Sequence, residues 1–166
     1  MLKLLKLPNL YALKEKNKMK LAHEIISDHV FRGRTSGFVN SVTKMIYGAK
    51  FYNDEKAFNA LCRLCIGDIK INNIDAIASI NTRDSHYNLP QRMAQVIAAH
   101  FNIPYISALS NKNTACSSRV ENKRILLFDD VIYTGKTLTK ASALIYKSGA
   151  QSVTCFAIAR SRSFKI

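Results

Sequence analysis

The chain has 166 residues, which is long enough for one domain with a sizeable hydrophobic core. It carries 25 Lys and Arg residues against 11 Asp and Glu residues, and the resulting net charge of +14 suits a polyanionic partner, either nucleic acid or a phosphorylated ligand. Its uncharged apolar runs never reach the length of about 18 residues that a membrane-spanning helix needs, so such a helix is excluded.

The amino-terminal segment and the cysteines indicate the compartment. Residues 1–8 place lysines among leucines and contain no cleavage-site pattern, so we do not expect a signal peptide. Four irregularly spaced cysteines suit reduced thiols and a cytoplasmic location. Cys62 and Cys65 have Cys-x-x-Cys spacing, but a zinc site needs two further ligands and both residues fall on an apolar helical stripe, so we expect them in the core.

Helical patterns dominate the first 70 residues. Residues 10–22 fit either two short strands or a helix, and residues 23–31 are ambiguous. A helical period starts at Phe38, and a second helix follows Asp54, which can cap it. Gly67 is well placed to end that second helix.

From residue 75 onward the chain alternates between strand and helix patterns. The expected strands are residues 75–80, 104–109, 125–128 and 152–159; one helix begins at Asn88 with Pro90 in its first turn and Val96 on its apolar face, and another ends at Gly149. This order predicts an α/β fold with a mostly parallel central sheet flanked by helices. Residues 1–70 would form an N-terminal helical hood on the core of residues 71–166, in one compact domain overall.

The most informative stretch joins a buried strand to a helix. Four apolar residues, 125–128, lead into Asp129 and Asp130, and a short turn over residues 131–137 opens a helical pattern. In open α/β sheets, ligands bind where the carboxyl ends of strands meet helix N-termini. Two neighbouring acids are costly inside a core, so we expect both at the end of the strand, facing a ligand. The alternative is that they merely cap the next helix.

The residue types in this stretch match the groups of a ribose 5-phosphate. Vicinal carboxylates can accept hydrogen bonds from two ribose hydroxyls. Residues 134–137, Thr-Gly-Lys-Thr, add backbone N–H groups, two hydroxyls and a helix N-terminus for a phosphate. The segment also ends like a Walker A loop, but Asp130 stands where that motif requires a glycine, which excludes a P-loop NTPase.

Residues 125–137 resemble the phosphoribosyl-pyrophosphate (PRPP) motif of type I phosphoribosyltransferases, which has four apolar residues, two acids and then Val-x-x-Thr-Gly-x-Thr. Within that superfamily the chain is most similar to the ComF competence-protein family, because residues 44–50 resemble its apolar segment that ends in a lysine and residues 87–104 resemble its loop and following helix. No cysteine precedes Cys62, so the N-terminal zinc ribbon of ComF-like proteins is absent. The resemblance covers roughly residues 38–162 and implies the type I phosphoribosyltransferase (Rossmann-like) fold.

The resemblance also implies roles for individual residues. Asp129 and Asp130 would bind the ribose hydroxyls of PRPP and act as the protein ligands of Mg²⁺, which pyrophosphate and ribose oxygens would hold for the most part. Arg119, in a mobile loop over residues 111–122, would contact a phosphate as a catalytic residue. The 5′-phosphate would lie against Tyr133, Thr134, Gly135, Lys136 and Thr137, and pyrophosphate would face Asn81, Thr82 and Arg83.

Two functions are therefore expected. In the first, the chain binds PRPP or a related ribose 5-phosphate with Mg²⁺ and transfers the phosphoribosyl group by displacing pyrophosphate, in a DNA-related process such as DNA uptake or antiphage defence. In the second, a non-catalytic accessory factor uses the same pocket for a nucleotide or a DNA end, with single-stranded DNA or another nucleic acid as its partner. The phosphoribosyl acceptor and the oligomeric state, a homodimer included, stay open.

Overall fold

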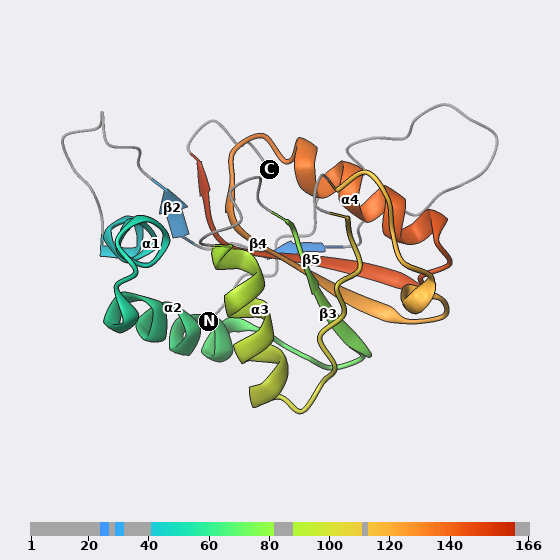
Figure 1. Ribbon diagram of the computed structural model, residues 1–166, viewed down its shortest axis with the longest axis horizontal. Coiled ribbons are helices and arrows are strands. Elements are labelled where there is room, and N and C mark those ends of the chain that lie inside the picture. Colours follow the sequence, from blue (N-terminus) through green and yellow to red (C-terminus); the bar gives the residue numbers. More distant parts are fainter. Residues whose placement is uncertain (1–23, 27–28, 32–40, 82–87, 111–112, 162–166) are drawn as a thin grey trace.

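Strands from both halves of the chain form one parallel sheet (Figure 1). The computed structural model describes residues 24–26, 29–31, 41–81, 88–110 and 113–161. Within them, β4 pairs with β3 on one side and with β5 on the other, and the far side of β5 pairs with both β1 and β2. The strands are β1 (Glu24–Ile26), β2 (His29–Phe31), β3 (Ala76–Ser79), β4 (Arg124–Ile132) and β5 (Ser152–Ser161).

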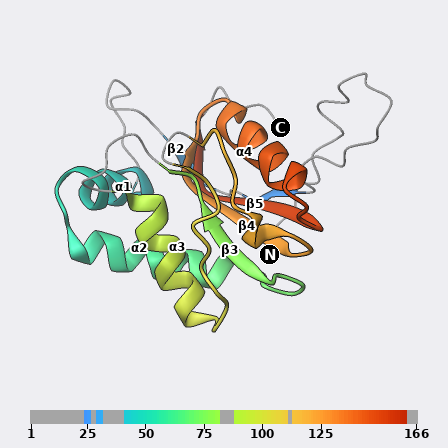
Figure 2. The ribbon, with the colours of Figure 1, turned by 45° about the vertical axis from the view of Figure 1, so that its right-hand side comes forward.

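Helices cover both faces of this sheet. Figure 2 shows α4 on the opposite face from α1, α2 and α3. On the three-helix face, Phe128 and Phe156 stack with their ring centroids 5.6 Å apart. Since neighbouring side chains of a strand point to opposite faces, the apolar run of β4 supplies both cores, which confirms the predicted α/β fold. The helices are α1 (Ser41–Phe51), α2 (Glu55–Asp68), α3 (Leu89–His100) and α4 (Lys136–Lys147).

Three helix ends follow their predicted signals. The Asp54 carboxylate accepts backbone N–H groups from the first turn of α2 at 2.9 and 3.1 Å and caps that helix. The Asn88 side chain caps α3 in the same way, with Pro90 in the first turn. Gly149, in the left-handed region at φ 92°, lies just past the end of α4.

Two predictions about helices are wrong. Gly67 does not end α2, because the helix continues to Asp68 and the buried Ile69 then turns into extended backbone. Burial of Ile69 therefore sets this end, without a left-handed glycine. Val96 is 40% exposed and does not belong to the apolar face of α3, which is made by residues on either side of it.

The predicted strand over residues 104–109 is also wrong. The segment makes only one parallel bridge to the sheet, between Ile77 and Tyr105, and then folds back so that Leu109 and Cys116 form an antiparallel bridge. Ile106 and Leu109 are nevertheless buried in the core under α4. Residues 104–109 thus have the apolar pattern of a buried strand but lack the ladder of backbone hydrogen bonds, and the sequence reveals only the pattern.

The amino-terminal part contributes to the core sheet as well as to its cover. The segment that is ambiguous in sequence supplies β1 and β2, which pair with β5, while α1 and α2 share one hydrophobic core with α3. Residues 10–22 lie outside the described residues. Cys62 and Cys65 are buried on α2, which confirms their place in the core, and burial raises the pKa of the Cys62 thiol to about 11. Among the described residues, no helix has the length and apolar content to cross a membrane.

Candidate functional site

The two acids of the central motif lie inside β4, which runs further than expected. The expectation that a turn begins at Val131 is wrong, since β4 continues to Ile132. β5 is ten residues long and supplies backbone partners over this extension. Asp129 and Asp130 are consequently buried, with exposed fractions of 8% and 5%.

The side chains of the two acids point to different surroundings. Asp130 meets α1, where Lys50 Nζ donates a hydrogen bond to its Oδ2 at 2.5 Å. Asp129 instead lines a small cavity beside the start of α4. Each carboxylate also accepts the backbone N–H of the following residue, Asp129 from Asp130 at 2.8 Å and Asp130 from Val131 at 2.7 Å. These bonds hold both carboxylates against the backbone of β4.

Burial and mutual repulsion dominate the electrostatics of the acids. Burial, followed by the neighbouring charge of Asp130, raises the pKa of Asp129 well above its usual range, although the Asp130 N–H and the charge of Lys50 oppose this. Burial lowers the pKa of Lys50, but the Asp130 carboxylate outweighs that effect and the pKa of Lys50 is raised overall. Lys50 therefore pairs with Asp130 and only partly offsets the burial of Asp129.

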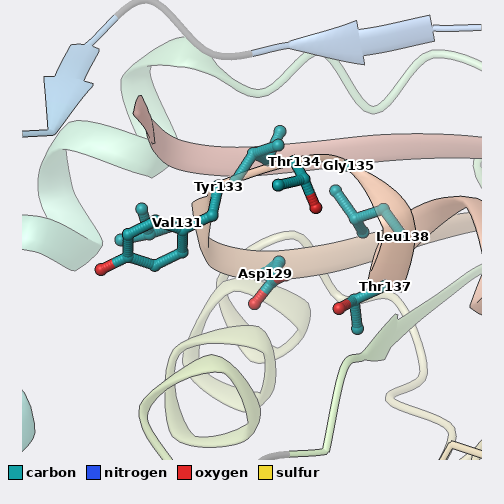
Figure 3. A pocket seen from close by; sticks show the side chains of 8 residues that line it. Asp129, Val131, Tyr133, Thr134, Gly135, Thr137 and Leu138 are labelled. Carbon is teal, nitrogen blue, oxygen red and sulfur yellow. The ribbon is translucent and has the colours of Figure 1, made fainter. Parts of the chain in front are cut away.

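A polar loop follows the acids and opens α4. Gly135 adopts the left-handed conformation, with φ 73°, and no side chain caps the N-terminus of α4. α2 and α3, by contrast, are both capped by a side chain. Figure 3 shows the hydroxyls of Thr134 and Thr137 on the side of the loop where Asp129 lies, whereas the Tyr133 ring extends away from them. A helix N-terminus without a side-chain cap offers its N–H groups to an anion.

We call Asp129, Asp130 and residues 133–137 the acid–loop site. The structure brings together all seven of these predicted residues at the carboxyl end of β4 and the start of α4. Lys136 is the first residue of α4 and is exposed, and Tyr133 is 57% exposed. The arrangement places acceptors for hydroxyl groups beside donors for an anion.

Asn81 lies two residues past the end of β3 and binds the segment that contains Leu109, Ser110 and Asn113. Its Nδ2 donates to the carbonyl oxygens of Leu109 and Ser110 at 2.7 and 3.1 Å. Its backbone N–H donates to Asn113 Oδ1 at 3.0 Å, and Asn113 Nδ2 donates back to the Asn81 carbonyl at 2.8 Å. Thr82 and Arg83, the other predicted pyrophosphate residues, lie outside the described residues.

Arg119 does not lie near the acid–loop site. It is an exposed residue of the short 3-10 helix η2 (Ser118–Val120), which leads into the amino end of β4 at Arg124. Asp129 lies five positions after Arg124 along the strand, which corresponds to about 16 Å. Val120 is fully buried and anchors η2 at that end of the sheet. The structure therefore does not support the predicted contact of Arg119 with a phosphate. Arg119 is close to the motif in sequence, but it precedes β4 and so lies at the amino end of the strand, whereas the acids lie towards the carboxyl end.

Sequence reasoning missed the role of Lys50. Residues 44–50 resemble a family segment that ends in a lysine, but the contact of Lys50 with Asp130 joins positions 80 residues apart. No local pattern in the sequence specifies such a pair. The same holds for Asn81 and Asn113, which lie 32 residues apart.

The described residues contain no group of three or more His, Cys, Asp and Glu side chains that could hold a metal ion. Asp129 and Asp130 supply carboxylate oxygens at the site, and Lys50 already engages Asp130. A cation at this place would consequently need most of its ligands from a bound molecule, as Mg²⁺ commonly does with phosphates.

Comparison with solved structures finds similar folds. An orotate phosphoribosyltransferase from Aeropyrum pernix is 17% identical with a TM-score of 0.50, and the match covers 74% of this chain and 65% of that chain. An adenine phosphoribosyltransferase from Thermoanaerobacter pseudethanolicus is 15% identical over 66% of this chain and 83% of that one, with a TM-score of 0.49. At such identities the likeness concerns the fold alone.

Comparison with family models identifies the family. No curated protein matches the sequence significantly. The family described as "Phosphoribosyl transferase domain" matches residues 75–165, which include β3, α3, β4, α4 and β5 and therefore the whole acid–loop site. Because the matched segment makes up more than half of the sequence, the chain belongs to the phosphoribosyl transferase domain family and has the type I phosphoribosyltransferase fold.

Proposed function

We propose that the chain binds PRPP in the acid–loop site and transfers its phosphoribosyl group to an acceptor. The observation that carries this proposal is the sequence of groups along β4 and into α4. Two buried carboxylates near the end of β4 are followed, after residues 131–134, by a left-handed glycine and a helix N-terminus without a side-chain cap. A ribose 5-phosphate has hydroxyls at one end and a phosphate at the other, and it matches this order.

Each end of the ligand has its own partners in the proposal. The ribose hydroxyls donate to Asp129 and Asp130, whose carboxylates each have acceptor sites beyond those already used. The 5′-phosphate accepts backbone N–H groups at the start of α4 and the hydroxyls of Thr134 and Thr137. Lys136 adds a positive charge at the same end.

The acids also suit the reaction. Displacement of pyrophosphate breaks the bond from the anomeric carbon to oxygen and leaves positive charge at that carbon in the transition state. Carboxylates fixed beneath the ribose stabilise this charge without reorganising, because local backbone bonds already hold them. Thr82 and Arg83 stay our predicted contacts for pyrophosphate, and Arg119 is left out of the proposed site for the reason given above.

Mg²⁺ belongs to the proposal as a ligand of the PRPP complex. Asp129 fits it, since a carboxylate next to phosphate oxygens is a common Mg²⁺ environment. Asp130 fits less well because Lys50 occupies one of its oxygens. When bound, the ion would neutralise charge on pyrophosphate as it leaves.

Calorimetric titration with PRPP tests the proposal. Wild-type protein is expected to bind PRPP in the presence of Mg²⁺, and Asp129→Asn is expected to weaken binding about tenfold or more, the loss that goes with one hydrogen bond to a charged group. Glu121→Gln is the matched control, because Glu121 is an exposed acid at the other end of β4. Absence of PRPP binding by the wild-type protein would refute the proposal.

A nucleic-acid partner is a second candidate, favoured by a surface next to the site. The described residues expose four large apolar side chains, and three of them are aromatic: Phe51 at 57%, Tyr52 at 69% and Tyr133 at 57%. Tyr133 belongs to the acid–loop site, and Phe51 and Tyr52 directly follow Lys50, which contacts Asp130. Bases of single strands stack on exposed aromatic rings, and the net charge of +14 suits their phosphates. Membership of the ComF family and a role in DNA uptake or antiphage defence fit this candidate and the phosphoribosyl transfer proposed above alike.

Salt dependence tests the second candidate. Binding of a single-stranded DNA oligonucleotide should fall steeply between about 50 and about 200 mM salt, because protein cations release counterions from the phosphates. Phe51→Ala should weaken binding by the stacking contribution of roughly one base. A protein that binds no oligonucleotide at about 50 mM salt would count decisively against this function.

A further inference from the structure

The last turn of α1 contributes a residue to the acid–loop site from outside the family-matched segment. The family match begins at residue 75, whereas Lys50 belongs to α1. Lys50 nevertheless donates to Asp130 at 2.5 Å, with exposed side-chain fractions of 29% for the lysine and 7% for the acid. The helices of the amino-terminal part therefore complete the charge arrangement of the core.

Close packing at the corner between α1 and α2 fixes where Lys50 lies. A Cβ atom at Gly48 would come within 3.2 Å of Ala57 Cβ and 3.3 Å of Asp54 Oδ2. The Asp54 backbone N–H also donates to the Gly48 carbonyl at 3.1 Å. Glycine is unfavourable inside a helix, and the close approach of α2 explains why a glycine stands at position 48. Ala49, next to Lys50, is buried in the same core.

We infer that Lys50 is a positioning residue of the phosphoribosyl site, which acts by holding the Asp130 carboxylate in the orientation that binds ribose. This inference rests on the proposed function. Asp130 Oδ2 accepts from Lys50 and Oδ1 accepts from Val131 N–H, so the carboxylate is held from two directions. A carboxylate has about four acceptor positions, so the bonds from Lys50 and Val131 leave about two of them open, and the same two bonds fix the direction in which the open positions point. Without Lys50, Asp130 would lose its fixed direction beside the buried Asp129.

A double-mutant cycle in PRPP binding separates this role from direct contact. Lys50→Met should weaken Mg²⁺-dependent PRPP binding about tenfold or more, and Lys50→Arg should recover most of the loss because it keeps a donor for Asp130. In an Asp130→Asn background, Lys50→Met should change binding less than about twofold. Lys44→Met is the matched control, since Lys44 is an exposed lysine of the same helix, and it should bind PRPP like the wild-type protein.

A second variant tests the route through α1 and keeps the inference testable if Lys50→Met folds poorly. Gly48→Ala removes no charged side chain, but its Cβ atom would crowd Ala57 and Asp54 and shift the last turn of α1 slightly, so it should weaken PRPP binding as well. Circular dichroism should show that each variant is folded. Unchanged binding in Lys50→Met, or an equal loss with and without the Asp130 carboxylate, would overturn the positioning role. Wild-type protein that binds no PRPP would refute the proposed function and this inference together.

Discussion

Replacement of Asp129 by asparagine is expected to stabilise the folded protein at neutral pH, even though it weakens ligand binding. Asp129 is 8% exposed, and burial together with the charge of Asp130 raises its pKa well above the usual range. Asparagine is nearly the same size and keeps an oxygen that can accept the Asp130 N–H, which Asp129 now accepts at 2.8 Å. The substitution therefore removes a buried charge and retains the local hydrogen bond.

The sign and size of the effect follow from proton linkage. Because the folded-state pKa exceeds the unfolded value, the folded protein binds more protons than the unfolded chain in the interval between them. The free energy of unfolding of the wild-type protein should then fall as pH rises from about 4 through the folded-state pKa, and level off above it. Each unit of pKa difference contributes about 1.4 kcal/mol, and each kcal/mol moves the Tm by about 2–4 °C in a domain of this size.

Urea denaturation between pH 4 and pH 8 measures the effect. Wild-type protein and Asp129→Asn should have similar stability at the acid end, and the variant should become the more stable of the two as pH rises. Glu121→Gln, an exposed acid, should show no such divergence. Stability curves for wild type and Asp129→Asn that stay parallel within about 0.5 kcal/mol would refute the reasoning, since that is the usual range for surface substitutions.

Three further perturbations test other parts of the structure. A double-mutant cycle of Lys50→Met and Asp130→Asn, followed by urea denaturation, should give a coupling free energy of about 2 kcal/mol between the two side chains. A coupling free energy under about 0.5 kcal/mol would mean that the pair stabilises the fold no more than an exposed ion pair does. Gly135→Ala should lower stability by about 1–2 kcal/mol because φ is 73°, as thermal melting can show; an unchanged Tm would contradict this. Cys62 and Cys65 should resist thiol reagents at pH 8 until urea unfolds the chain, since burial raises both pKa values; fast labelling of native protein would argue against their burial.

Local chemistry accounts for the parts of the site that the sequence predicted. The apolar run before Asp129, the Thr-Gly-Lys-Thr loop and the helical period after it are neighbours in the chain, so spacing alone orders them in space. Asp54, Asn88 and Gly149 were likewise recognisable as helix ends because capping depends on residues within one turn.

Tertiary packing decided what the sequence could not predict. Ile106 and Leu109 are buried like strand residues, yet their segment makes only one bridge to β3 before it folds back. The extent of β4 depends on the length of β5, which no pattern within β4 reveals. Arg119 stands five positions before β4 in sequence, and only the direction of that strand shows that it belongs to the opposite end of the sheet.

The charges around the acid–loop site fix the direction in which a ligand can lie. Lys50 pairs with Asp130, while the buried Asp129 lines the cavity beside α4, so this end of the site offers carboxyl oxygens to groups that donate hydrogen bonds. The start of α4 has no side-chain cap and is followed by Lys136, so that end favours an anion. A free phosphate would be repelled from the acids, and an uncharged diol would gain nothing from the helix. The proposed ligand, which carries hydroxyls and a phosphate a few ångströms apart, would satisfy both ends, and this gives the two buried acids a reason to stand beside the loop that follows them.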